Sequence, residues 1–129
     1  MNSERGQAKA GKPRDIAERT FEFAERIVAP CRAAKGRDVA ARVIVGQLVR
    51  AGTSVGANVE EAQASHSRAD FANKCSIACK EARETRYWMR LLAASDIVSA
   101  SSLADLLAES DELVAILTAI VRKARQPAP

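Results

Sequence analysis

The sequence predicts an all-α protein: an up-down-up-down antiparallel four-helix bundle formed by residues 15–125. Hydrophobic residues make up 47% of the chain but aromatic residues only 4%, and this composition favours helix packing over a β-sheet. None of the four prolines lies between positions 31 and 126, so long helices are permitted there. Apolar residues then recur at helical spacing through four successive segments.

The first helix is expected from Asp15, which caps it, to about Ala29. Its inward positions recur at helical spacing: Ile16, Thr20, Phe23 and Ile27. The stretch PCRAAKGR then turns the chain, with Gly36 as a left-handed cap. Residues 1–14 precede this helix, and they have two glycines, a proline and no aromatic or branched apolar residue. They predict a disordered basic tail.

The second helix is expected over residues 37–64, although it contains RAGTSVGANVEEA, which has the composition of a turn. A heptad of apolar or glycine residues nevertheless runs through it: Ala41, Val45, Leu48, Gly52, Val55, Val59 and Ala62. Each glycine costs a helix about 0.5–1 kcal/mol relative to alanine, so Gly52 and Gly56 predict close approach of a neighbouring helix. Asn58 lies beside this seam and is expected to be partly buried and hydrogen-bonded.

The third helix is expected from a cap at Ser67, with Asp70 three residues later, to about Ser95. Its seam again steps by four and three: Phe71, Cys75, Ala78, Ala82, Thr85, Met89 and Leu92. The fourth helix is expected from Leu103 to Arg125 with Ser102 as its cap, and its inward residues are Leu106, Leu113, Leu117 and Ile120. Residues 126–129 form a short C-terminal tail.

The basic charge of the chain lies mainly at its ends and on one face of the third helix. Residues 1–14 hold four basic residues against one acid, and residues 122–129 hold three and none. Arg83, Arg86 and Arg90 fall within about 60° of one another on the helix, and none has an acid three or four residues away. Two interpretations are open: acids on a neighbouring helix or subunit, or phosphates of a nucleic acid. No exposed aromatic series interleaves with these arginines, so base stacking is not expected.

The remaining residues offer little chemistry. The only histidine, His66, lies in a predicted link and is expected to be solvated, while Cys75 and Cys79 are expected to pack in the core. Glu60, Glu61 and Asp70 form an acidic patch without the histidines of a carboxylate metal site. We therefore expect no catalytic residues, no metal and no cofactor. There is no signal or membrane segment, and the three cysteines lack framework spacing, so a cytoplasmic location is expected.

Two stretches together resemble a known family. QLVRAGTSVGANVEEAQAS, followed by DFANKCSIACKEARETRYWMRLL, is similar to the signature of bacterial four-helix-bundle proteins first noticed as reading frames within intervening sequences of 23S rRNA genes. The positions in register are Gln47, Leu48, Arg50, Ala51, Ser54, Val55, Asn58, Val59 and Glu61, then Phe71, Ile77, Ala78 and Glu84. The resemblance covers roughly residues 15–123. Gly56 stands where the family often has proline, and Glu60-Glu61-Ala62 replaces its A-E-G, so the helix is expected to run further.

The resemblance implies a ring-shaped homopentamer of bundles. The family is similar in fold to the accessory subunit of diversity-generating retroelements, which binds nucleic acid and a reverse transcriptase. The leading hypothesis is a non-enzymatic homo-oligomer that binds RNA or DNA phosphate through Arg83, Arg86, Arg90, Arg122 and Lys123. The motif residues expected to be structural are Arg50, Ser54, Asn58 and Glu61. The alternative is a structural or protein-interaction module whose arginine stripe is a subunit interface.

Overall fold

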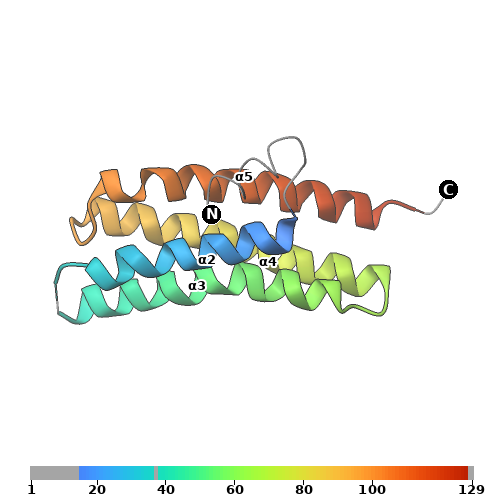
Figure 1. The fold of residues 1–129 in the computed structure, drawn as a ribbon, viewed down its shortest axis with the longest axis horizontal. Helices are drawn as coiled ribbons and strands as arrows, with labels where there is room; N and C mark the ends of the chain where they lie inside the picture. The colour runs from blue at the N-terminus through green and yellow to red at the C-terminus, as the bar shows by residue number, and fades with distance from the viewer. Residues whose placement is uncertain (1–14, 37, 128–129) are drawn as a thin grey trace, which may run out of the picture.

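The computed structural model describes residues 15–36 and 38–127, and within them the chain forms four helices and no strand. These are α2 (Ile16–Ala33), α3 (Val39–Gln63), α4 (Arg68–Ala94) and α5 (Ala100–Arg125). Figure 1 shows the four running along the long axis with links at alternate ends. The predicted up-down-up-down bundle is therefore confirmed. The predicted tail 1–14 and residues 128–129 lie outside the described residues.

Each helix packs against two others, α3 against α2 and α4, and α5 against α4 and α2. The predicted seams form the core between them, because nearly every seam residue of α3 and α4 is buried. Val45 and Phe71 are the exceptions and are half-buried. The largest side chains with no exposure include Phe23, Met89 and Leu113.

The stretch RAGTSVGANVEEA is helical throughout, as the heptad predicted. A Cβ atom on Gly56 would lie 3.2 Å from the backbone oxygen of Thr20 in α2, and one on Gly52 would lie 3.0 Å from Cγ1 of Ile27. The helix backbones thus approach closely at Gly56, whereas a side chain fills the space at Gly52. Asn58 is half-buried and donates from Nδ2 to the carbonyl of Ser54 at 2.9 Å.

Three predicted helix boundaries are wrong by up to four residues. α2 continues through Pro30 to Ala33, because a proline in the last turn removes only one backbone hydrogen bond and its φ suits a helix. α3 begins at Val39 rather than 37, because the Asp38 carboxylate caps it by accepting from Ala41 N at 2.8 Å.

α5 begins three residues earlier than predicted. Its cap is Ser99, whose hydroxyl accepts from the backbone N–H of Ser102 at 3.4 Å. The predicted cap, Ser102, instead donates its hydroxyl to the carbonyl of Ser99 at 2.8 Å. The caps at Asp15 and Ser67 are confirmed. Gly36 has a left-handed φ of 88°, but it lies in the link after Ala34, which ends α2.

Candidate functional site

The three arginines of α4 lie exposed on one side of the bundle, next to α5. Arg86 donates from Nη1 to Oδ1 of Asp111 on α5 at 2.8 Å, so the interpretation of acids on a neighbouring helix holds for this residue. The one hydrogen bond of Arg83 among the described residues runs from Nη1 to the sulfur of Cys79, at 3.5 Å. Arg90 forms no ion pair within residues 15–36 and 38–127. The part of the chain that the structure describes thus neutralises the stripe only in part.

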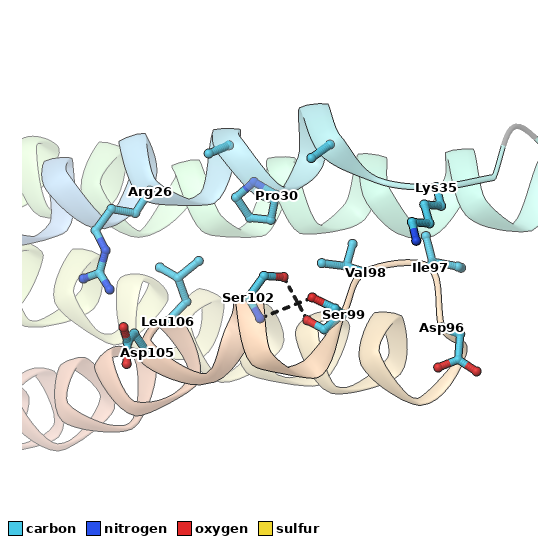
Figure 2. A pocket seen from close by; sticks show the side chains of 12 residues that line it. Arg26, Pro30, Lys35, Asp96, Ile97, Val98, Ser99, Ser102, Asp105 and Leu106 are labelled. Carbon is cyan, nitrogen blue, oxygen red and sulfur yellow. Dashed lines mark hydrogen bonds between the residues drawn. The ribbon is translucent and has the colours of Figure 1, made fainter.

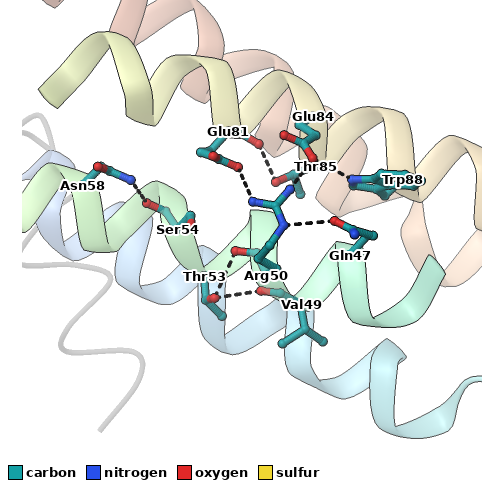
Figure 3. A network of polar contacts seen from close by, with 10 residues as sticks. All are labelled: Gln47, Val49, Arg50, Thr53, Ser54, Asn58, Glu81, Glu84, Thr85 and Trp88. Carbon is teal, nitrogen blue, oxygen red and sulfur yellow. Dashed lines mark hydrogen bonds and ion pairs between the residues drawn. The ribbon is translucent and has the colours of Figure 1, made fainter. Parts of the chain in front are cut away.

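The acids of α4 do not neutralise the stripe, because they face the opposite neighbour. Glu81 and Glu84 both accept hydrogen bonds from the guanidinium of Arg50 on α3, and the contact from Nη1 to Glu81 Oε1 is 3.1 Å (Figure 3). The same guanidinium donates from Nε to Gln47 at 3.0 Å. Trp88 completes the network by donating from its ring N–H to Glu84 at 3.2 Å.

This network explains why the family-motif residues are spaced as they are. Arg50 and Glu84 belong to separate parts of the motif and pair across the α3–α4 contact. Ser54 supplies the carbonyl that Asn58 binds within α3. Glu61 is exposed near the end of α3, where its carbonyl accepts from the Ser65 hydroxyl at 3.4 Å. Of these contacts, the ion pairs of Arg50 tie α3 to α4.

Arg122 and Lys123 do not join the α4 stripe. Both are exposed in the last turns of α5, where the carbonyl of Lys123 accepts from Nη2 of Arg68 at 3.2 Å. Arg68 is the first residue of α4, and Arg83 lies fifteen residues further along the helix. At 1.5 Å per residue the two regions are roughly 22 Å apart along the bundle. The structure therefore divides the five predicted residues into two basic regions.

Sequence reasoning missed a bidentate ion pair between α2 and α5. Arg19 donates from Nε and Nη2 to the two carboxylate oxygens of Glu109, at 2.7 and 2.8 Å, and from Nη2 to Glu112 at 2.9 Å. Hydrogen bonding to Glu109 raises the pKa of Arg19 above its ordinary value, although partial burial opposes the shift. Glu109 is only 9% exposed. Ninety residues separate the pair, and no local pattern signals it.

A hollow of about 790 Å³ opens between the end of α2 and the start of α5 (Figure 2). Its apolar wall includes Pro30, Val98 and Leu106, and charged side chains such as Arg26 and Asp105 stand at its edge. The backbone N–H of Lys35 closes one end by donating to the carbonyl of Ile97 at 3.0 Å. None of the described residues that line this hollow is a histidine or a cysteine.

The other candidates from the sequence lie apart from one another. His66 is exposed in the α3–α4 link, as expected, and Cys75 and Cys79 are buried. Burial raises the pKa of Cys75, and it raises that of the half-buried Cys31 to about 11. Within the described part of the chain, no three side chains of the metal-binding types cluster to hold an ion. None of the described helices is both long and apolar enough to cross a membrane.

Tyr87 is a feature of the stripe that the sequence did not reveal. It is 55% exposed, and it lies four residues after Arg83 and three before Arg90. Residues at these separations share one face of a helix. One exposed aromatic side chain therefore stands among the arginines, although it is not the series of aromatic residues whose absence the sequence indicated.

These features define a class: an all-helical bundle with a cationic outer face and no recognisable active site in its described residues. The model of the 23S rRNA-intervening sequence protein family matches residues 12–119, and the chain belongs to this family. The fold is also that of a crystal structure from Bacteroides thetaiotaomicron, a protein of unknown function from the S23 ribosomal protein family. The two chains are 35% identical, with a TM-score of 0.76 over 84% of this chain and 99% of the other. No curated protein matches.

Proposed function

We propose that this protein is a non-enzymatic, self-associating bundle that binds the phosphate backbone of RNA or DNA through Arg83, Arg86 and Arg90. The observation that carries the proposal is the exposure of all three arginines while Glu81 and Glu84 of the same helix are engaged by Arg50. Arginine presents planar N–H donors that match phosphate oxygens. Arg122 and Lys123 offer a second contact region about 20 Å away for a long polymer.

Self-association has separate support on the outer face of α3. Val39 and Val43 lie one turn apart and are among the most exposed large apolar side chains of the described residues. A neighbouring pair of this kind favours a contact with another chain. We propose a homo-oligomer on this basis, with the pentamer of the family as the expected size. Partnership with a reverse transcriptase stays a prediction, which the gene neighbourhood tests.

The test is fluorescence anisotropy with a labelled 20-nucleotide RNA at 50 and 300 mM NaCl. Three phosphate contacts with a single strand predict about a 40-fold loss of affinity over this range. We expect Arg83/Arg86/Arg90→Ala to bind at least tenfold more weakly. The matched control, Arg26/Arg32/Arg42→Ala, removes the same charge from exposed sites on α2 and α3 and should bind nearly as well as the parent.

Light scattering on the same proteins separates the proposal from its rival. If the stripe is a subunit interface, the triple change on α4 shifts the molar mass, whereas phosphate binding leaves it unaltered. Affinity that is independent of salt, or that survives the triple change, refutes the proposal.

A further inference from the structure

The surroundings of Tyr87 are suited to an unpaired base. Its ring is 5.0 Å from that of Trp88 at an interplanar angle of 76°, and this edge-to-face contact restricts its orientation. Trp88 is itself held by its hydrogen bond to Glu84. A Tyr ring that is half exposed and held in this way presents a rigid apolar surface, with little conformational entropy to lose when it binds a ligand.

A hollow of about 410 Å³ lies directly beside this ring, between α4 and α5. Tyr87, Leu91 and Leu107 line it together with two alanines, and Arg90 is the only charged residue among the described residues of its lining. This volume lies within the range of about 300–1,000 Å³ that ligand pockets occupy. The hollow therefore joins an aromatic ring, an apolar floor and an arginine with no ion pair among the described residues.

We infer that this hollow receives an unpaired nucleobase stacked on Tyr87, while Arg83 and Arg90 contact the phosphates that flank it. The inference rests on the proposed function and specifies its ligand as single-stranded nucleic acid or an unpaired loop. The two arginines lie seven residues apart, about 10 Å along the helix, with Tyr87 between them. A continuous duplex is excluded from this mode, because its bases are paired and stacked and cannot reach a side chain on a helix surface.

The charge of the site favours this ligand over a second protein subunit. The arginines on either side of Tyr87 can each contact an anionic group, and the 5′ and 3′ phosphates that flank one base of a strand supply two such groups. Among the residues that the structure describes, Asp111 is the one acid paired with the stripe, and its partner is Arg86 rather than Arg83 or Arg90.

The experiment measures binding of one labelled 20-nucleotide RNA, alone and annealed to its complement, at 100 mM NaCl. The unmodified protein should bind the single strand more tightly. Tyr87→Ala should weaken single-strand binding by about 5- to 150-fold, as loss of one stacked base does, and leave duplex binding unchanged. Tyr87→Phe keeps the ring and should bind like the parent. The control is Phe21→Ala, because Phe21 is 59% exposed on α2 beside Glu22 and Glu25.

The salt dependence adds a readout that a folding defect would not produce. Tyr87→Ala should lower the affinity without altering the slope of log K against log salt, whereas Arg90→Ala should reduce that slope by about 0.7 for a single strand. If Tyr87→Ala binds the single strand as the parent does while the arginine triple change abolishes binding, the base site is wrong and the proposed function stands. Equal affinity for both RNA forms, or a changed molar mass of Tyr87→Ala, also overturns the base site. If the parent binds neither RNA, both proposals fail.

Discussion

The glycines of α3 allow the packing argument to be tested by one substitution at two sites. Gly46→Ala and Gly56→Ala each gain about 1 kcal/mol of helix propensity. A Cβ on Gly46 meets nothing within 4 Å, so that variant should keep the whole gain. A Cβ on Gly56 meets the Thr20 backbone at 3.2 Å, and Thr20 is fully buried in α2. Overpacking of this kind costs about 1–3 kcal/mol, so we expect a net loss of about 1 kcal/mol.

The two variants should therefore differ by about 2 kcal/mol in the free energy of unfolding. For a chain of this size the difference corresponds to about 8 °C in Tm. Thermal unfolding followed by circular dichroism measures it, with all proteins at one concentration because the proposed self-association would make Tm depend on concentration. If Gly56→Ala is as stable as Gly46→Ala, α2 does not approach α3 as closely as the structure has it, and the reasoning from the glycine spacing fails.

Three further perturbations test other contacts. Glu109→Gln should lower the free energy of unfolding in urea by about 2 kcal/mol, because Arg19 loses a bidentate charged partner; Glu112→Gln, at the exposed partner of the same arginine, should cost under about 0.5 kcal/mol. Arg50→Ala should lower the free energy of unfolding by about 1 kcal/mol. It should also shift the fluorescence emission of Trp88, the only tryptophan, because Arg50 and Trp88 both donate to the carboxylate of Glu84; unchanged emission would count against the network. The pKa of Cys31 is raised from 9.0 to about 11, so its contribution to stability is fully present below pH 9 and is lost as pH rises through 11. Alkylation of Cys31 in the folded protein should accordingly accelerate up to about pH 11, and a plateau near pH 9 would contradict this.

The errors at the helix ends show where reasoning from local sequence is weakest. Ser99 and Ser102 are both good caps, and only the backbone of the α4–α5 link decides that Ser99 takes the role. At Pro30 the predicted helix was too short, because a proline, which normally ends a helix, is tolerated in the final turn of α2.

The candidate site was only partly predictable for a related reason. The exposure of Arg83, Arg86 and Arg90 is consistent with the buried seam on the other side of α4, whereas the sequence left open what the three arginines contact. The pairing of Arg86 with Asp111, and the separation of Lys123 from the stripe, depend on the register between α4 and α5. Periodicity within one helix carries no information about that register.

The sequence by itself determined the helices, their buried faces and the family, because a repeat of apolar residues every three or four positions is a local property. Tertiary structure alone decided which charges are neutralised and which surface is left hollow. Arg19 pairs with Glu109, ninety residues away in the sequence. Arg50 pairs with Glu81 and Glu84 of α4, so these two acids do not neutralise the arginine stripe. Tyr87 lies exposed beside a hollow between α4 and α5. Each outcome depends on how one helix is rotated and shifted against another, and that is set by the packing of whole faces.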